Sequence, residues 1–350
     1  MNEYIGVDVF SGAGGMALGA TYAGVKVLKA IEKDYHAALT YKHNNLDTEV
    51  INDDILNVND LNIERSDRKL IIFGGPPCQG FSTSNQKTRS SKNPNNWLFL
   101  GFFNLINKLK PEIIVFENVK GIIETENAVF FNRIIANFEN IGYTTSHWIL
   151  NAADYGVPQF RNRLFIIGSK KGKRYEKPKQ TIKKHVSVGE AINDLPILSN
   201  GSSFDVLPYK FVKPSNYALK LRGNLKFCKN HLVTNSSEQI IARYKTVPQG
   251  GNWENIPVEL MKNYSNRMRC HTGIYRRLRE DLPSVVIGNF RKNMLIHPKE
   301  DRGLSVREAA RLQSFPDSYE FKGSIGFQQQ QVGDAVPPLL AKSVFDIVTK

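Results

Sequence analysis

Cysteine is scarce in this chain, with three among 350 residues, at Cys78, Cys228 and Cys270. None of them has the Cys-x-x-Cys spacing of a zinc site, and an odd number cannot close a disulfide framework. Long apolar runs are also missing, so no segment is expected to span a bilayer, and no signal peptide opens the chain. These absences predict a protein of a reducing compartment, the cytoplasm, without a metal and without a membrane partner.

Acidic residues are scarce in one part of the chain only. Residues 169–300 carry 25 Lys and Arg against 10 Asp and Glu, whereas the flanking parts are nearly balanced. Such a segment can neutralise phosphates and gain affinity by releasing counterions. It can equally be a solubilising surface or a basic linker, and the run from Lys170 to Lys184 is open to that interpretation. The confinement of the excess favours a polyanionic partner, either DNA or RNA.

The first half of the chain alternates short apolar runs with stretches of helical spacing. The apolar runs are at 4–10, 25–31, 70–73, 112–116 and 163–168. This alternation predicts an α/β fold with a doubly wound, mostly parallel sheet. Regular patterns then fade and return near Ser305, a predicted helix N-cap, and Pro337. We expect one domain at 1–168, a smaller basic domain at 169–300, and a segment at 301–350 that completes the first domain.

Cys78 has the most informative context of the three cysteines. It lies in Gly74-Gly75-Pro76-Pro77-Cys78-Gln79-Gly80-Phe81-Ser82, just after the apolar run 70–73. Gly-Gly-Pro-Pro ends that predicted strand, so Cys78 stands on a rigid turn at its carboxyl end, where open α/β sheets bind ligands. A structural cysteine is usually packed inside an element as a small hydrophobe. The position therefore favours a nucleophile.

A glycine-rich turn, Ser11-Gly12-Ala13-Gly14-Gly15, follows the first predicted strand. Its glycines permit close approach by a nucleotide-like ligand, although such turns also serve plain packing. Glu32, at the tip of the second strand, could accept hydrogen bonds from both ribose hydroxyls. Asp54 could add an acceptor for an adenine amino group. The third-glycine spacing of a dinucleotide site is missing, so the pattern favours S-adenosylmethionine over NAD.

Charged side chains also stand beside two further predicted strands. Glu117 ends the run 113–116, where a low dielectric could raise the pKa of its carboxyl and suit it to donate a proton. A helix cap or a solvated strand end is the plain alternative. Arg161 and Arg163 stand at i and i+2, so both would point to one face and suit a carboxylate, a phosphate or a carbonyl oxygen. A surface arginine pair is the ordinary explanation.

A series of segments in fixed order resembles the bacterial DNA (cytosine-5)-methyltransferases of restriction-modification systems. The segments are Asp8-Val9-Phe10-Ser11-Gly12-Ala13-Gly14-Gly15, Glu32, Asp54-Ile55, Gly75-Pro76-Pro77-Cys78-Gln79-Gly80-Phe81-Ser82, Glu117-Asn118-Val119, Gln159-Phe160-Arg161-Asn162-Arg163, Arg307-Glu308-Ala309-Ala310-Arg311-Leu312-Gln313-Ser314-Phe315-Pro316-Asp317 and Gln331-Val332-Gly333-Asp334-Ala335-Val336-Pro337-Pro338. The resemblance runs from one end of the chain to the other. Pro-Pro-Cys-Gln followed by Glu-Asn-Val is a specific combination.

The resemblance implies a fold and a reaction. The fold is the Rossmann-like sheet of S-adenosylmethionine-dependent methyltransferases with a second, smaller target-recognition domain. Cys78, as a thiolate, would add to C6 of cytosine so that C5 can take the methyl group, leaving S-adenosylhomocysteine. Glu117 would protonate or hydrogen-bond N3, Arg163 would bind the O2 edge and Arg161 would support the pocket. No metal is required.

The resemblance also implies the cofactor contacts. Phe10 would stack on adenine, Gly12 and Gly14 would line the methionine side, and the helix after Val336 would return beside the first glycine-rich turn. Two residues depart from the family pattern: Lys33 stands where an aromatic often occurs, and Asp334 stands where Asn is usual. The implied cofactor residues are Phe10, Gly12, Gly14, Gly15, Glu32, Asp54, Pro76, Asp334 and Val336.

The implied substrate is a cytosine inside duplex DNA, which must be rotated out of the stack at a cost of roughly a few kcal/mol. Residues 82–97 resemble the family's mobile loop that closes over DNA; a merely disordered surface loop is the alternative. The basic segment resembles the target-recognition domain, whose side chains bind phosphates or bases. The implied DNA-contacting residues are Ser82, Gln249, Gly250, Arg267, Arg276, Arg277 and Arg279.

Two alternatives remain open at this stage. A tRNA cytosine methyltransferase would share the scaffold, but the RNA-acting branch carries a Cys-Phe-Thr triplet that this chain lacks. A DNA-binding module without catalysis is disfavoured by the intact set of Cys78, Glu117 and Arg163. We therefore expect a monomer in the cytoplasm, associated with the nucleoid, that acts on double-stranded DNA beside a cognate restriction endonuclease.

Overall fold

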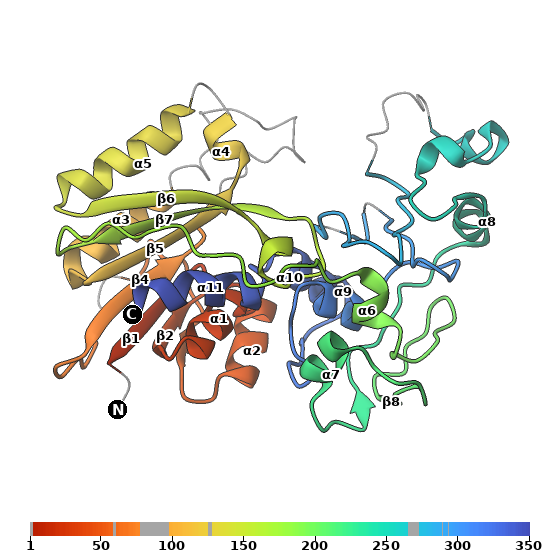
Figure 1. Ribbon diagram of the computed structural model, residues 1–350, viewed down its shortest axis with the longest axis horizontal. Helices are drawn as coiled ribbons and strands as arrows, with labels where there is room; N and C mark the ends of the chain where they lie inside the picture. The colour runs from red at the N-terminus through yellow and green to blue at the C-terminus, as the bar shows by residue number, and fades with distance from the viewer. Residues whose placement is uncertain are drawn as a thin grey trace. The chain divides into compact units, whose positions relative to one another are not determined.

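The computed structural model describes residues 3–58, 61–77, 98–124, 128–264, 273–288, 290–292 and 294–350. Cys78, Ser82, Arg267 and the segment 82–97 lie outside these residues, so what the sequence predicts for them stays a prediction. The chain forms two compact units, drawn in Figure 1. The first unit holds Met1–Tyr155, Arg161–Thr181 and Val336–Lys350, and the second holds Gly156–Phe160 and Ile182–Ala335.

The first unit is built on a mixed sheet with the strand order β3-β2-β1-β4-β5-β7-β6. The strands are β1 (Tyr4–Val9), β2 (Lys26–Ile31), β3 (Glu49–Ile51), β4 (Lys69–Gly74), β5 (Ile113–Val119), β6 (Thr144–Asn151) and β7 (Asn162–Ser169). β7 pairs antiparallel with both β5 and β6, whereas the pairs from β3 through β5 are parallel. The predicted α/β class and mostly parallel sheet are confirmed.

Helices cover both faces of this sheet, as Figure 1 shows. They are α1 (Gly15–Tyr22), α2 (Tyr35–Asn44), α3 (Phe99–Leu109), α4 (Gly121–Glu124), α5 (Val129–Asn140), the short 3₁₀ helix η5 (Ala152–Tyr155) and α11 (Pro338–Val348). Leu70 and Ile72 of β4 join α3 and α5 in one core, while Phe73 packs edge-on against Phe345 of α11. Because strand side chains alternate between faces, one buried strand serves both layers.

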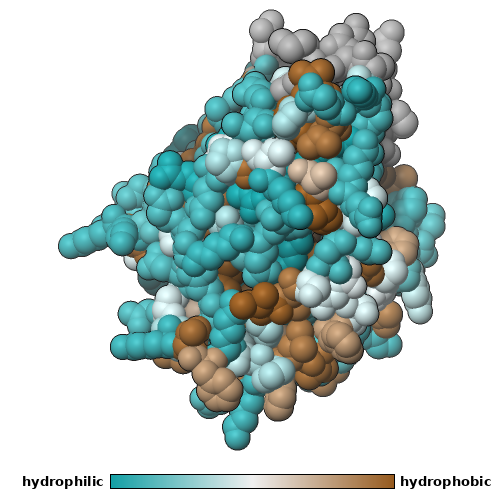
Figure 2. Space-filling view, turned by 90° about the vertical axis from the view of Figure 1, so that its right-hand side faces the viewer, coloured by the Kyte–Doolittle hydropathy of each residue, from teal (hydrophilic) through white to brown (hydrophobic). Residues whose placement is uncertain are grey.

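The second unit contains short elements joined by long irregular segments. They are α6 (Val188–Ile192), β8 (Leu207–Pro208), α7 (Asn216–Arg222), β9 (Phe227–Cys228), α8 (Glu238–Thr246), the 3₁₀ helices η6 (Trp253–Asn255) and η7 (Val258–Met261), α9 (Val306–Leu312) and α10 (Ile325–Asp334). Ser305 caps α9 as predicted, because its side chain accepts a hydrogen bond from Glu308 N. Figure 2 shows one face of the molecule, on which apolar patches interrupt a largely hydrophilic surface.

The second unit is organised around buried arginines that no sequence pattern revealed. The Arg311 guanidinium lies 2.6 Å from Asp317 Oδ2 and also binds Asp194. Both carboxylates are fully buried, and Tyr209 OH donates to Asp317 at 2.6 Å. These contacts tie α9 to residues far earlier in the chain within one unit. The boundaries therefore differ from the predicted ones: the first unit runs on to Thr181, and its return begins at Val336 instead of residue 301.

Candidate active site

The carboxyl ends of three parallel strands bring the predicted catalytic and cofactor segments to one edge of the first unit. Val9 lies beside Gly74 at the ends of β1 and β4, and Gly74 lies beside Phe116 of β5. Phe10 and Gly75 therefore follow two neighbouring strand ends, and Glu117 lies next to them in β5, just past the last residue that pairs with β4. This is the edge at which open α/β sheets bind ligands.

Glu117 and Arg163 form an ion pair at this edge. Arg163 Nε lies 2.9 Å from Glu117 Oε1, and both side chains are largely shielded from solvent. Burial raises the pKa of the Glu117 carboxyl, and the nearby Arg163 and Arg161 guanidiniums oppose that rise. A carboxyl with a raised pKa is suited to donate a proton.

Gly75 leaves the room that the Glu117 carboxyl occupies. A Cβ atom at Gly75 would stand 2.6 Å from Glu117 Oε2, well inside van der Waals contact. The next residue of the sequence is also fixed, because Asn118 Nδ2 donates to the Pro76 carbonyl at 3.0 Å. The backbone that leads toward Cys78 is thereby held against the end of β5. The role of Gly75 was not predicted, although its place before Pro-Pro was visible.

Arg161 is buried behind this edge, as a supporting residue would be. Its side chain is 1% exposed. Its backbone N–H donates to Asn151 Oδ1 at 3.2 Å, and its carbonyl accepts from Ala152 N at 2.9 Å. Its guanidinium lowers the pKa of Glu117 through the charge alone. Its support of the pocket stays a prediction.

The glycine-rich turn after β1 adopts left-handed backbone conformations. Gly12 and Gly14 have φ of 53° and 88°, and Gly14 is the N-cap of α1. Phe10 has φ of 58°, which is unusual for a bulky residue and marks a position that its surroundings force. The turn is closed by Gly14 N donating to the Ser11 carbonyl at 3.0 Å. Glycine at 12 and 14 follows directly from these dihedral angles.

Glu32 holds the same turn in place. Its Oε2 accepts from Gly12 N at 2.7 Å, and its Oε1 accepts from Asp34 N at 2.7 Å. Burial raises the pKa of the Glu32 carboxyl, while these two hydrogen bonds lower it. A carboxylate offers roughly four lone-pair positions, so acceptor capacity for ribose hydroxyls remains.

The Asp54 carboxylate meets Lys33, the first of the two departures from the family pattern. Lys33 Nζ lies 2.8 Å from Asp54 Oδ2, while Asp54 Oδ1 accepts from Leu56 N at 3.0 Å. The hydrogen bond from Lys33 lowers the pKa of Asp54. The predicted adenine acceptor is therefore charged and already has a cationic partner in this structure.

The turn fits an adenosine-containing cofactor on physical grounds. A Cβ atom at Gly12 would meet nothing within 4 Å, so the backbone there is open to a ligand. Ser11 Oγ and Asp8 Oδ2 are buried and make no hydrogen bond with the described residues. Burial, and then the nearby charge of Glu32, raise the pKa of Asp8 well above its usual value. Asp8 was missed as a site residue, although a carboxylate inside the apolar run 4–10 was the available signal.

The remaining predicted cofactor residues are Asp334 in the second unit and Val336 and Gly15 in the first. Asp334 ends α10 and is exposed, while Val336 begins the return to the first unit. α11 packs against α1, the helix that follows the glycine-rich turn: a Cβ at Gly19 of α1 would lie 2.5 Å from Ala341 Cβ of α11. The predicted part of α11 in the cofactor pocket stays a prediction. Gly15, the first residue of α1, is buried.

The predicted DNA-contacting residues of the second unit lie side by side. Gly250 N donates to the Arg277 carbonyl at 3.0 Å, and Glu280 N donates to Gln249 Oε1 at 3.1 Å. Arg276 is partly exposed between them. Arg279 is exposed and forms a two-pronged pair with Asp281, at 2.9 and 2.6 Å.

Arg277 does not fit the predicted role of a DNA contact. Its side chain is buried, and its guanidinium donates to the carbonyls of Val247, Tyr244, His297 and Glu300 and to Asp301 Oδ1. These bonds use all five N–H donors of an arginine. The guanidinium is therefore a structural crosslink of the second unit, with no donor left for a base or a phosphate.

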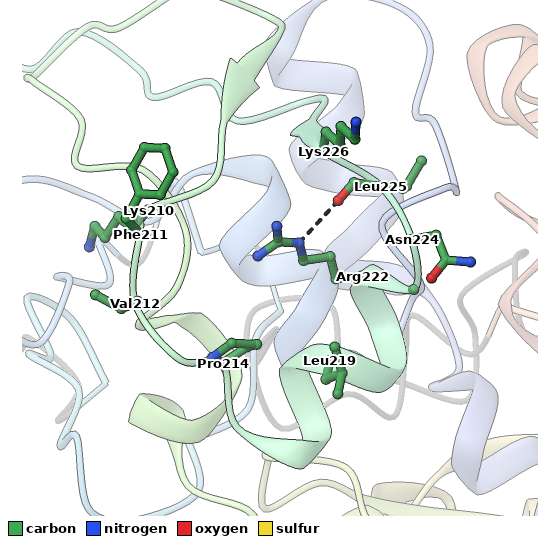
Figure 3. A pocket seen from close by; sticks show the side chains of 10 residues that line it. Lys210, Phe211, Val212, Pro214, Leu219, Arg222, Asn224, Leu225 and Lys226 are labelled. Atoms are coloured by element: carbon green, nitrogen blue, oxygen red, sulfur yellow. Dashed lines mark hydrogen bonds between the residues drawn. The ribbon is translucent and has the colours of Figure 1, made fainter.

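A separate hollow of about 530 Å³ lies in the second unit (Figure 3). Phe211, Val212, Pro214 and Leu219 line it together with basic side chains, and Arg222 Nε donates to the Leu225 carbonyl at 3.0 Å. None of the residues that the sequence predicts for catalysis or cofactor binding lines it. We assign the candidate site to the sheet edge instead, because that is where the titratable pair and the open glycine turn lie.

Metal clusters and membrane spans are both missing from the described residues. These residues contain no group of three or more His, Cys, Asp or Glu side chains placed to hold a metal ion. No helix in the described part of the chain is long and apolar enough to cross a membrane.

Comparisons with known proteins agree with this geometry. The family model described as C-5 cytosine-specific DNA methylase matches residues 4–350. The Type II methyltransferase M1.HphI of Haemophilus parahaemolyticus is 36% identical over 349 residues, which cover 98% of this chain and 86% of that protein. The Type II methyltransferase M.DdeI of Desulfomicrobium norvegicum is 35% identical over 369 residues, covering 98% and 88%.

A solved structure shows the same architecture over nearly the whole chain. It belongs to a protein assigned as a DNA modification methyltransferase encoded within an E. coli prophage, with 26% identity and a TM-score of 0.78. The match covers 99% of this chain and 98% of that one. The chain belongs to the C-5 cytosine-specific DNA methylase family. The predicted enzyme class, DNA (cytosine-5)-methyltransferase, is thereby confirmed.

Proposed function

We propose that this chain methylates C5 of a flipped-out cytosine within a specific double-stranded DNA sequence, through a covalent bond between Cys78 and C6. The observation that carries the proposal is the buried Glu117–Arg163 pair, with Nε and Oε1 2.9 Å apart, next to the backbone that leads into Pro76. It lies at the sheet edge that also carries the open glycine turn. S-adenosylmethionine, held by that turn, supplies the electrophilic methyl group.

The residues of the site divide the work of activating a poor nucleophile. The Cys78 thiolate adds to C6, and electron density moves toward N3 of the ring. Glu117, whose pKa is raised by burial, hydrogen-bonds or protonates N3 at that moment. Arg163 binds the O2 edge, and buried Arg161 supports it from behind. C5 then takes the methyl group, and the electron pair of the bond that breaks stays on the sulfonium sulfur, which leaves S-adenosylhomocysteine. Loss of the C5 proton to solvent and elimination of the Cys78 sulfur from C6 then release the product.

The cofactor contacts belong to the same proposal. Phe10 and Asp54 would hold adenine, Glu32 the ribose, and Gly12 and Gly14 the methionine portion. Gly15, Pro76 and Val336 complete the predicted set, and Asp334 joins it at the amino-acid end. The open space above Gly12 and the unsatisfied Ser11 hydroxyl support this placement.

The wider setting is also proposed here. The substrate is duplex DNA, contacted by Ser82, Arg267, Gln249, Gly250, Arg276 and Arg279. The partner is a restriction endonuclease of the same system, since the relatives named above are Type II methyltransferases. We place the enzyme in the cytoplasm, with the nucleoid, as a monomer.

Replacement of the nucleophile tests this proposal. Cys78→Ser should abolish methyl transfer from labelled S-adenosylmethionine to DNA while leaving binding of a mixed-sequence duplex largely intact. Cys228→Ala, at a buried cysteine of the second unit, is the matched control and should keep transfer. Bisulfite sequencing of plasmid DNA after expression would identify the methylated cytosine. Full transfer by Cys78→Ser would refute the covalent role, and transfer to tRNA alone would refute the substrate.

A further inference from the structure

The segment 170–181, here called the strap, leaves β7 and runs back along the outer strand of the first unit. β6 is the last strand of the sheet. Lys170 N donates to the Glu112 carbonyl at 3.1 Å, just before β5 begins. Tyr175 N donates to Ser146 Oγ of β6 at 2.9 Å. The strap is therefore attached to the sheet from its first residues onward.

The far end of the strap is attached near the candidate site. The Tyr155 hydroxyl donates to the Pro178 carbonyl at 3.0 Å, and Thr181 N donates to the Asp154 carbonyl at 3.1 Å. Both partners lie in η5, which follows Asn151, the residue that binds the backbone of Arg161. The strap thus spans the sheet from the end opposite Glu117 to the edge that carries it, within a single compact unit.

The strap is strongly cationic and its cations point into solvent. It contains six Lys and Arg residues and a single acidic residue, Glu176. All six basic residues are exposed. Among the described residues no carboxylate lies within ion-pair distance of any of them, although Lys173 Nζ lies over the Tyr175 ring at 4.6 Å. The basic residues of the strap are Lys170, Lys171, Lys173, Arg174, Lys177 and Lys179.

Attachment of the backbone separates the strap from a flexible basic linker. Its four hydrogen bonds order the main chain, so the backbone that carries these charges stays fixed on the first unit at little further entropic cost. Unpaired cations in a fixed row release counterions when they meet a row of phosphates. Duplex DNA presents such a row, with one phosphate of each strand for about every 3.4 Å of helix axis. An acidic protein surface carries fewer and less regular charges.

We propose that the strap binds the phosphate backbone of duplex DNA flanking the target site. This inference rests on the proposed function, because a cytosine at the sheet edge would bring flanking DNA toward the strap end beside η5. Contacts to phosphates carry no sequence information, so the strap would add affinity without reading sequence. It would let the enzyme hold duplex of any sequence while it searches for its target.

The plain alternative is that the lysines only protect an exposed sheet edge. Lysines on and near an edge strand discourage pairing with another chain. That role needs positive charge near β6 and requires no DNA at all. The two roles differ in how DNA affinity depends on salt.

The test compares two triple variants of the full chain with equal loss of charge. The first is Lys171→Gln, Lys177→Gln and Lys179→Gln, which keeps the lysine stacked on Tyr175. The control is Lys26→Gln, Lys42→Gln and Lys110→Gln, at exposed positions of the first unit away from the strap. Binding of a 40-base-pair mixed-sequence duplex is measured from low to high salt, and unfolding curves check both folds.

The slope of log affinity against log salt should decrease by about 0.9 for each phosphate that a substituted lysine no longer neutralises, so by up to about 2.7 in the strap variant. At about 0.1 M salt this corresponds to roughly an eightfold weaker affinity per phosphate. The control should keep the slope of the unmodified chain. Equal slopes for the two variants would overturn the proposal, and aggregation of the strap variant with an unchanged slope would leave edge protection as its role.

Methyl transfer by the unmodified chain, measured separately, keeps the two proposals distinct. If the unmodified chain methylates DNA and the two variants have equal salt slopes, only the proposal that the strap binds phosphates is refuted. The other informative result is a slope that decreases in the strap variant while the unmodified chain transfers no methyl group. That result supports phosphate binding by the strap and refutes the proposed function.

Discussion

The two units use charge in opposite ways. In the first unit the cations of the strap are exposed and unpaired, while Glu117 and Arg163 lie together at a ligand-binding edge. In the second unit Arg277 and Arg311 are buried and engaged in internal bonds. A basic stretch of sequence therefore does not translate directly into a basic surface. Exposed charge on the first unit is available for binding, whereas the charge of Arg277 and Arg311 holds the fold of the second unit.

The largest effect on folding should follow from breaking the enclosed network. Arg311→Met would leave Asp194 and Asp317 buried without their nearest cation. Arg222 and Arg307 remain 3.9 Å from these carboxylates, so the free energy of unfolding should fall by about 3 kcal/mol. Lys342→Met is the matched control, since it breaks an exposed pair with Asp346, worth about 1 kcal/mol or less. Urea unfolding of both variants measures the difference. Equal decreases in the free energy of unfolding of the two variants would show that the buried arginine network contributes no more to stability than a surface ion pair.

A pH-dependent effect of comparable size should come from His231 in the second unit. Burial lowers the pKa of this histidine to about 4, and Nε2 lies 2.8 Å from the Pro196 carbonyl while Nδ1 lies 2.8 Å from Ser305 Oγ. The pKa of His231 is lower in the folded chain than in the unfolded chain, so the neutral imidazole is the form that the fold favours. Its contribution to stability is complete above about pH 6.5 and is lost as the pH falls toward 4. The loss amounts to about 3 kcal/mol.

The measurement is the free energy of unfolding at pH 7 and at pH 4.5, in the unmodified chain and in His231→Gln. The glutamine can still donate to the Pro196 carbonyl but does not titrate. The variant should lose less stability on acidification than the unmodified chain. Parallel losses would show that His231 is not the group responsible.

The smallest expected effect on folding, but a clear one on chemistry, concerns the first unit. Gly75→Ala would place a methyl group 2.6 Å from Glu117 Oε2 and shift the carboxyl from its position beside Arg163. A displacement of about 1 Å at a reacting group can cost about a hundredfold in rate. Gly288→Ala, where a Cβ would meet nothing within 4 Å, is the control. The comparison would fail if Gly75→Ala lost stability but kept its turnover number for methyl transfer.

Much of the first unit was predictable, because its strands are apolar runs that end in glycine, proline or a carboxylate. β6 was not predicted, since an edge strand with His147 and Trp148 among partly exposed residues lacks a clear apolar pattern. Phe10 was named as a ligand contact, but its left-handed backbone is set by tertiary contacts and has no local signal. Arg277 shows most clearly what the sequence could not predict. The sequence around an arginine does not distinguish a buried side chain that binds backbone carbonyls from an exposed one that binds phosphates.

The place of α11 has a consequence for how the protein is made. This helix supplies Phe345 against Phe73 and Ala341 against Gly19, so a layer of the first unit comes from residues that follow the whole second unit in the chain. On the ribosome, β1 and α1 wait for the whole second unit to be synthesised before their partner emerges. Contacts of such sequence separation slow folding. A nascent chain halted at Ala335 would lack α11, so the face of α1 that packs against α11 would stay exposed.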